Sequence, residues 1–242
     1  DQTLSAEDRL AAGDNPTIAA LHETHPLRDG ISPSQPQRFK VERPKSSFAA
    51  WYQFFPRSEG ATIDPNTGKI IQGTLKTSMA GLERAAAEGF DIVYLPPVFP
   101  IGVTNRKGRN NTLIAGPHDP GSPFGIGSEL GGHDTVDPLL GTMDDFKALC
   151  QRAHELGLEI ALDFALQCSP DHPWVKAHPN WFRHKPDGSI AFAENPPKKY
   201  QDIYPIDFNA DMPGIEKEVE RIMNLWIEAG VTIFRIDNPH TK

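Results

Sequence analysis

The sequence predicts an α/β fold built on a parallel sheet, and two observations support this class. A unit made of an amphipathic helix, a glycine and a short apolar strand recurs at residues 79–96, 142–163 and 213–237. Helices that alternate with apolar strands are typical of parallel sheets with right-handed crossovers. The residue pattern alone leaves two architectures open, a doubly wound sheet and a (β/α)8 barrel.

Length, composition and charge limit the classes of protein to which this sequence can belong. With 242 residues, of which 38% are hydrophobic, the chain has enough apolar material for one large core. It has no initiating Met, signal peptide or membrane-spanning stretch, so we expect a soluble excerpt of a longer protein. The formal net charge of -8 disfavours nucleic acid and anionic membranes as partners. Two cysteines, Cys150 and Cys168, favour a reducing cytoplasm over a disulfide framework.

The chain divides into a polar start and an apolar remainder. Residues 1–45 are rich in proline and predict a linker or the tail of a preceding domain, with a helical turn only at residues 17–21. The aromatic run at residues 48–55 is the first expected strand. We therefore assign residues 46–242 to one domain.

The three repeat units have recognisable boundaries. Thr142 and Asp145 form a capping pair, Pro213 suits a first helical turn, and a glycine follows each helix. Apolar residues at helical spacing predict helices over residues 79–88, 142–156 and 213–229, which precede strands at residues 90–96, 158–163 and 231–237.

Two long connections interrupt this rhythm, at residues 98–141 and 164–212. Both follow the carboxyl end of a strand, and connections of this length inside a compact domain are usually functional. The second is long enough to form a subdomain-like insertion. No metal-binding spacing of the His-Glu-x-x-His or Cys-x-x-Cys type occurs, so we expect histidines such as His133 and His172 to be polar loop residues.

Charged residues interrupt the last apolar strand. Val231, Ile233 and Ile236 belong to a run of the kind buried on both faces, yet Arg235 and Asp237 lie within it. These two charges are two residues apart, so on a strand they point to the same side and favour each other's ionised form. The pair is equally compatible with a nucleophilic aspartate and with a structural ion pair.

Three short motifs give the chain a family resemblance. Phe234-Arg235-Ile236-Asp237, Leu162-Asp163 and the segment at residues 136–142 occur in the order found in the α-amylase superfamily of retaining glycosidases and transglycosylases. From Ser47 to the end, the chain resembles that superfamily. The resemblance implies a partial (β/α)8 TIM barrel of about the first four strands, with long loops inserted after strands two and three.

Departures from the superfamily pattern narrow the resemblance. Gln167-Cys168 stands where many amylases have Asn-His, which makes a simple starch hydrolase a weaker interpretation. With the segments at residues 105–111, 195–204 and 237–242, the chain resembles the superfamily's bacterial maltosyltransferases. These move maltosyl units from maltose 1-phosphate to α-1,4-glucans in glycogen synthesis and release phosphate.

The resemblance also implies roles for individual residues. Asp237 would be the nucleophile, and Arg235 would orient it and keep it ionised. Asn111, Gln167 and Asp163 match positions at or beside the donor sugar, although Asp163 could instead support Arg235. The phosphate pocket would contain Lys107, Asn195, Lys198, Tyr200 and Asn238.

An enzyme of this type needs further groups. A general acid/base and another carboxylate lie beyond the fourth strand in the superfamily, so we expect this chain to be inactive alone. The resemblance implies a homodimeric full-length protein and neither cofactor nor metal. The alternatives are another hydrolase or a trehalose-forming isomerase of the superfamily, and a non-catalytic glucan-binding relic of the fold.

Overall fold

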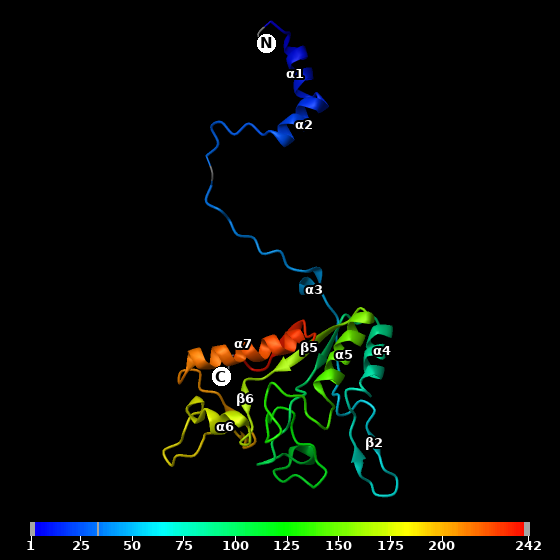
Figure 1. The fold of residues 1–242 in the computed structure, drawn as a ribbon, viewed down its shortest axis with the longest axis vertical. Helices are drawn as coiled ribbons and strands as arrows, with labels where there is room; N and C mark the ends of the chain where they lie inside the picture. The colour runs from blue at the N-terminus through cyan, green and yellow to red at the C-terminus, as the bar shows by residue number, and fades with distance from the viewer. Residues whose placement is uncertain (1–2, 33, 240–242) are drawn as a thin grey trace. The chain divides into compact units, whose positions relative to one another are not determined.

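The computed structural model describes residues 3–32 and 34–239, which fall into two compact units, Asp1–Glu42 and Arg43–Lys242 (Figure 1). The end of the C-terminal motif quoted above, His240 to Lys242, lies outside the described residues. Within the described part of the chain, no helix is both long and apolar enough to cross a membrane.

The first unit contains two helices, α1 (Ala6–Gly13) and α2 (Pro16–Thr24). The prediction of a single helical turn here was wrong, because each helix has a start signal in its sequence. Ser5 accepts a hydrogen bond from the Asp8 backbone N–H (3.1 Å), and Asn15 accepts one from Thr17 (2.9 Å). Neither helix has a buried residue, so local capping rather than a core stabilises them.

The second unit is organised on a four-stranded parallel sheet with the order β1-β4-β5-β10. Strands that follow one another along the chain are therefore neighbours in the sheet, as right-handed crossovers produce. The predicted parallel sheet is confirmed. Its strands are β1 (Trp51–Gln53), β4 (Ile92–Leu95), β5 (Glu159–Phe164) and β10 (Ile233–Ile236); β5 ends one residue beyond its expected range, and the other three lie within theirs.

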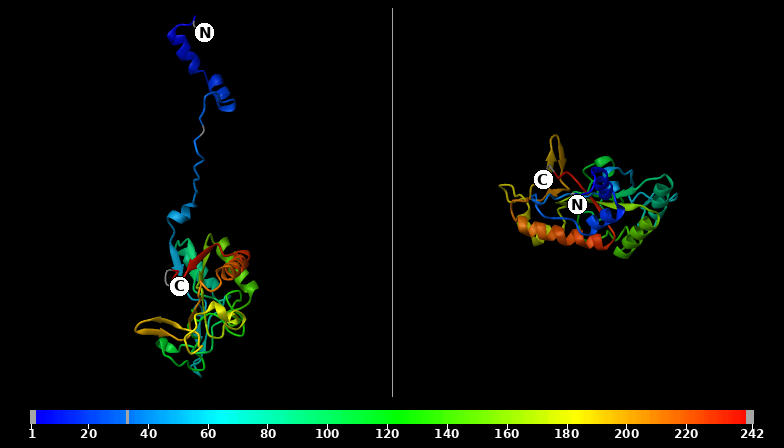
Figure 2. Two further views of the ribbon diagram at one scale, coloured as in Figure 1. Left: turned by 90° about the vertical axis from the view of Figure 1, so that its left-hand side faces the viewer. Right: turned by 90° about the horizontal axis from the view of Figure 1, so that it is seen from above.

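Three crossover helices, α4 (Met79–Ala87), α5 (Met143–Glu155) and α7 (Met212–Glu228), lie on the same side of this sheet (Figure 2). Thr142 and Asp145 form the predicted capping box at the start of α5. At the start of α7, Asp211 accepts hydrogen bonds from the Gly214 backbone N–H (3.1 Å) and the Trp181 indole N–H (3.0 Å). A short helix, α3 (Pro44–Ser47), precedes β1.

The core fills the space between the sheet and the helices. Val93 and Leu95 of β4 alternate toward the helices together with Ile160 and Leu162 of β5, and all four are at most 2% exposed. Trp226 of α7 packs into the same hydrophobic cluster and is fully buried. The helix side of the sheet thus supplies the hydrophobic stabilisation of this unit.

The opposite face of the sheet is different. By the strand register it carries Tyr94, Asp163 and Arg235, and Trp51 on the same face is 45% exposed. Within the described sheet, β10 lies at an edge and Ile236 is 42% exposed. Polar side chains are therefore concentrated on the face that the helices leave uncovered.

The connections between strands contain further short elements. Asp171 joins the two longest connections by accepting hydrogen bonds from the backbone N–H groups of Val103 (2.6 Å) and Thr104 (2.7 Å). The remaining elements are β2 (Thr62–Ile63), β3 (Ile70–Ile71), η1 (Arg109–Asn111), β6 (Gln167–Cys168), α6 (Pro173–Ala177), η2 (Pro179–Trp181), β7 (Ala193–Asn195), β8 (Lys198–Tyr200) and β9 (Tyr204–Pro205).

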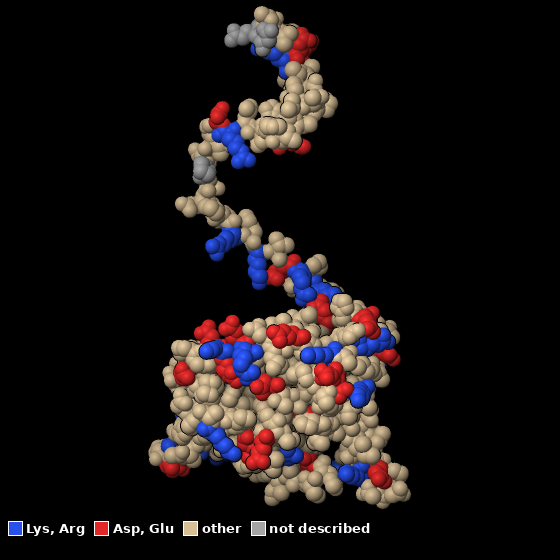
Figure 3. Space-filling view, in the orientation of Figure 1, with Lys and Arg blue, Asp and Glu red and all other residues tan. Residues whose placement is uncertain are grey.

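Surface charges of both signs are mixed on the face drawn in Figure 3, where basic and acidic side chains lie beside one another. Arg221 of α7 is one example, because it lies 2.7 Å from Glu218 and 2.8 Å from Asp134. Such exposed pairs contribute little to stability.

Candidate active site

The candidate site begins where β5 and β10 end side by side. Arg235 pairs in register with Asp163, so their side chains leave the sheet on the same face, and Asp237 follows two residues later. Arg235 Nη1 lies 3.0 Å from Asp163 Oδ2 and 2.5 Å from Asp237 Oδ1. One guanidinium nitrogen therefore joins two carboxylates. The second Asp237 oxygen accepts a hydrogen bond from Asn238 Nδ2 (3.0 Å).

The two carboxylates of this group have different surroundings. Asp163 is fully buried, and burial raises its pKa to about 6 despite the opposing effects of the Tyr94 hydroxyl and the Arg235 charge. Asp237 is only half-buried. Burial lowers the pKa of Arg235, but the hydrogen bond to Asp237 and the Asp163 charge outweigh this and leave it raised. The site thus combines a permanent cation with an accessible carboxylate.

A cleft of about 570 Å³ opens beside Asp237. Its walls come from both long connections and from the end of β10, so these parts of the chain meet beside Asp237. Residues singled out from the sequence that line this cleft are Asn111, Gln167, Asn195, Tyr200, Asp237 and Asn238.

Backbone conformation also marks this cleft. Among the described residues, those other than glycine with a positive φ are all asparagines. Asn111 (φ 63°) and Asn238 (φ 46°) are two of them, and both line the cleft. Asparagine tolerates this left-handed region better than most residues, and such conformations are concentrated at functional sites.

The remaining predicted residues do not line the cleft. Asp163 and Arg235 lie on the sheet and contact each other at 3.0 Å, and neither lines the cleft. Lys107 is only 5% exposed; its Nζ donates a hydrogen bond to Gln201 Oε1 (2.8 Å) and lies 3.9 Å from Asp202 Oδ1. The Lys107 ammonium group therefore lies behind the cleft wall, because Asp202 is part of that wall.

Lys198 is exposed on the β7–β8 hairpin. It pairs in register with Asn195, and Tyr200 lies two residues further along the same strand. Partners in an antiparallel pair, and residues two apart on a strand, share a face. Lys198 therefore lies on the hairpin face that carries the cleft residues Asn195 and Tyr200.

Two residues of the site were missed in the sequence. The hydroxyl of Tyr94 donates a hydrogen bond to Asp163, and Asp202 is a nearly buried carboxylate in the cleft wall. Burial raises the pKa of Asp202. The alternation of β4 against β5 could have placed Tyr94 on the face of Asp163, whereas no local pattern distinguishes Asp202 from other loop residues.

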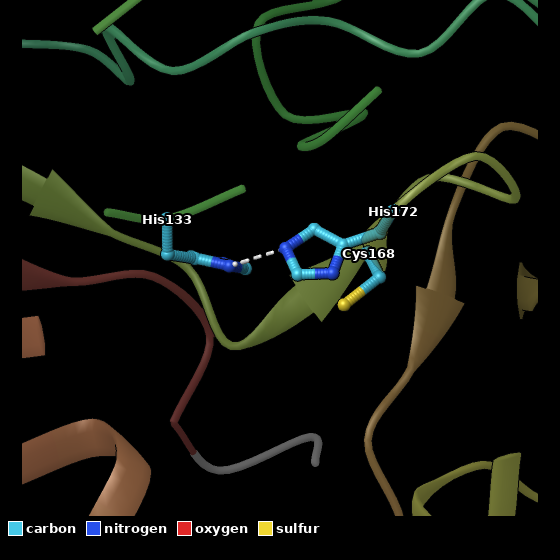
Figure 4. A group of neighbouring side chains, drawn as sticks. All are labelled: His133, Cys168 and His172. Atoms are coloured by element: carbon cyan, nitrogen blue, oxygen red, sulfur yellow. Dashed lines mark hydrogen bonds between the residues drawn. The ribbon is translucent and has the colours of Figure 1, made fainter. Parts of the chain in front are cut away.

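One buried cluster near the site combines potential metal ligands: His133, Cys168 and His172 (Figure 4). His133 and His172 lie in loops, as expected, but they are buried, with exposed fractions of 1% and 2%. They are buried since the two long connections pack against each other here.

Hydrogen bonds explain this cluster without a metal ion. His172 Nδ1 accepts from the Trp174 backbone N–H (3.0 Å), so its proton is on Nε2, which donates to His133 Nδ1 (3.0 Å). The other His133 nitrogen then donates to the carbonyl oxygen of Ala165 (2.8 Å). Coordination through His172 Nε2 would require an imidazolate or the loss of the bond to Trp174. Burial lowers the pKa of His172 to about 2, which keeps this ring neutral.

The fold is similar to that of solved α-amylases, although no family model matches the chain. An α-amylase from Lactobacillus plantarum is 29% identical with a TM-score of 0.59, covering 79% of this chain and 38% of its own. A maltogenic α-amylase from Thermotoga neapolitana is 27% identical with a TM-score of 0.60, covering 80% and 40%. The chain is therefore similar in sequence and fold to these α-amylases.

In sequence, the chain also matches proteins named α-1,4-glucan:maltose-1-phosphate maltosyltransferase. It is 99% identical over 242 residues to the one from Bifidobacterium longum and covers 32% of it. It is 77% identical over 242 residues to the one from Bifidobacterium animalis subsp. lactis, covering 33%. The Mycobacterium tuberculosis protein is 53% identical over 234 residues. The chain spans about a third of the length of these relatives.

Proposed function

We propose that the full-length protein containing this chain is a retaining glycosyltransferase. It transfers maltosyl units from α-maltose 1-phosphate to the non-reducing end of an α-1,4-glucan and releases phosphate. The observation that carries this proposal is that Asp237 lines the cleft while Arg235 holds one of its oxygens at 2.5 Å. The names of relatives that are up to 99% identical supply the donor and acceptor.

Asp237 would act as the nucleophile in a double displacement. An Asp237 oxygen attacks the anomeric carbon, the bond from that carbon to the phosphate oxygen breaks, and phosphate leaves with the bonding electrons. The 4-hydroxyl of the glucan then attacks the anomeric carbon from the face opposite Asp237, gives its proton to a general base supplied by the rest of the full-length protein, and releases Asp237 as a carboxylate. Two inversions retain the α configuration. Arg235 and Asn238 fix the orientation of Asp237 throughout because they bind its two oxygens.

The phosphate would bind on the side of the cleft formed by the second long connection. Asn195, Tyr200 and Asn238 line this region and offer neutral hydrogen-bond donors. Lys198 shares the hairpin face of Asn195 and Tyr200, and Lys107 places its charge behind Asp202. These neutral donors and the Lys198 cation suit a phosphate dianion and the charge that accumulates as it leaves, whereas the Lys107 charge also balances the Asp202 carboxylate in the cleft wall.

The sheet would form the first half of a (β/α)8 barrel. The helices cover one face, and the opposite face carries the site and leaves Trp51 exposed. Strands β1 and β10 each have a neighbour on one side only within the described sheet. We expect the rest of the full-length protein to pair with these edges and to provide the general acid/base.

A covalent trap tests the proposed nucleophile in the full-length protein. A 2-fluoro maltosyl fluoride should label the peptide that contains Asp237, because the 2-fluorine slows both displacements while the reactive anomeric fluoride keeps the first fast enough for the covalent intermediate to accumulate. Asp237→Ala should abolish this labelling and phosphate release, while calorimetry still detects maltose 1-phosphate binding. Labelling of Asp237→Ala would refute the assignment. Reducing sugar from starch without phosphate-dependent transfer would instead identify a hydrolase.

A further inference from the structure

Tyr94 of β4 lies next to the charged group that holds the proposed nucleophile. Its hydroxyl donates a hydrogen bond to Asp163 Oδ2, the same oxygen that lies 3.0 Å from Arg235 Nη1. The Arg235 guanidinium carbon also lies 5.7 Å from the centre of the Tyr94 ring, in a cation–π arrangement. One side chain therefore contacts both Asp163 and Arg235.

The buried charge of Asp163 is stabilised by two hydrogen-bond donors, the Tyr94 hydroxyl and Arg235 Nη1. It is fully buried, and its other oxygen, Oδ1, has no hydrogen-bond partner in the described part of the chain. A buried carboxylate with few donors loses much of the stabilisation that water would give its charge. The ionisable groups that face it are Tyr94, Arg235 and Asp237. Burial, followed by the bond to Asp163, raises the pKa of Tyr94, so this hydroxyl keeps its proton and remains a donor.

We propose that Tyr94 is a positioning residue for Asp237: its hydroxyl fixes Asp163 and its ring supports Arg235, so that Arg235 presents Asp237 to the cleft. This inference rests on the proposed function, in which Asp237 is the nucleophile. Tyr94 is not among the residues that line the cleft, so it acts through Arg235 and not by contact with the substrate.

The hydrogen bond has a consequence for pH dependence. Because the Tyr94 hydroxyl stabilises the ionised form of Asp163, it opposes the effect of burial on the pKa of that group. Removing the hydroxyl should raise this pKa further above its present value of about 6. Asp163 would then become neutral at a higher pH, and Arg235 would lose one of its two carboxylate partners as the pH falls.

The test compares pH profiles of kcat/KM for the full-length maltosyltransferase and its Tyr94→Phe variant. The acid limb should move up by roughly one to two pH units, the scale of a hydrogen bond to a charged group. Activity should approach that of the unmodified enzyme well above the new limb, and KM for maltose 1-phosphate should change less than twofold. In an Asp163→Asn background, Tyr94→Phe should no longer move the acid limb.

Tyr52→Phe is a matched control, because it removes the same atom from the neighbouring strand. The Tyr52 hydroxyl accepts a hydrogen bond from Arg84 (3.0 Å), and that guanidinium lies 5.6 Å from its ring, but the pair faces the helices. The Tyr52→Phe variant should therefore not shift the acid limb of the kcat/KM profile.

Two results would overturn the proposal. One is an unchanged acid limb in Tyr94→Phe. The other is a decrease in kcat/KM that is the same at every pH and that Tyr52→Phe also shows. Thermal unfolding of each variant identifies a general loss of structure. Labelling of Asp237→Ala by the fluoride would refute the proposed function itself. If the fluoride does not label Asp237→Ala and the pH profile of Tyr94→Phe is unshifted, only the role of Tyr94 is refuted.

Discussion

Replacing Lys198 with alanine tests whether the β7–β8 hairpin delivers a cation to the donor phosphate. Lys198 shares its hairpin face with Asn195 and Tyr200, which line the cleft. Lys199 points to the opposite face and lies 3.9 Å from Glu194, a cleft carboxylate that already pairs with its charge. The two lysines are adjacent and both exposed, so they differ mainly in the direction of the side chain.

The expected magnitude follows from the exposure of this side chain. A hydrogen bond to a charged group contributes about 1.5–3 kcal/mol, and an exposed lysine belongs at the lower end because water screens it. A loss of about 1.5 kcal/mol in transition-state stabilisation corresponds to a roughly tenfold decrease in kcat/KM. Lys198→Ala should therefore reduce transfer from maltose 1-phosphate about tenfold.

The assay measures initial rates of the full-length enzyme with two donors, maltose 1-phosphate and α-maltosyl fluoride. The fluoride has no phosphate, so Lys198→Ala should slow its reaction much less. Lys199→Ala should leave both rates nearly unchanged. Equal losses with both donors would refute the phosphate role, because they would indicate sugar positioning or a disturbed hairpin. Equal rate losses in Lys198→Ala and Lys199→Ala would also refute the phosphate role of Lys198.

Two further predictions concern folding. Gly127→Ala should lower the free energy of unfolding of the full-length protein by about 1–3 kcal/mol, measured as a lower melting temperature. The new Cβ would lie 2.1 Å from His172, and the φ of this position is +99°. Gly188→Ala, with φ +82° and open space around it, should cost less, and an equal change in both would contradict the steric argument. The isolated 242-residue chain should aggregate or pack loosely, since Trp51 and Ile236 are exposed on edge strands; a cooperative thermal transition of a soluble monomer would contradict this.

The regular elements of the second unit could be predicted from the sequence because their signals are local. Thr142 and Asp145 lie three residues apart, and a helix start brings them into contact whatever the rest of the chain does. Helical and strand spacing likewise indicated α4, α5 and α7 and the strands between them. The aspartate and arginine of β10 stood out because charged residues are unfavourable in an apolar strand.

The cleft itself depended on tertiary structure. Asn111 and Asn195 come from connections that are far apart in the sequence, and both line the cleft with Asp237. No local pattern gives the relative position of two long loops, since their path is set by contacts such as the one between Asp171 and Thr104. A sequence can therefore name residues with suitable chemistry but cannot show which of them line the same cleft.

Burial of polar groups was decided in the same way. His133 and His172 were interpreted as loop residues because nothing nearby in the sequence indicates a buried polar side chain. Packing of the two connections removes water from both rings and supplies the hydrogen bonds that compensate them. Tyr94 gains its importance in the same way, because its hydroxyl meets Asp163 only when β4 and β5 pair in register. The sequence by itself determined which segments form helices and strands and which residues carry charge. Only the tertiary structure decided which charges are buried, because burial depends on neighbours from distant parts of the chain.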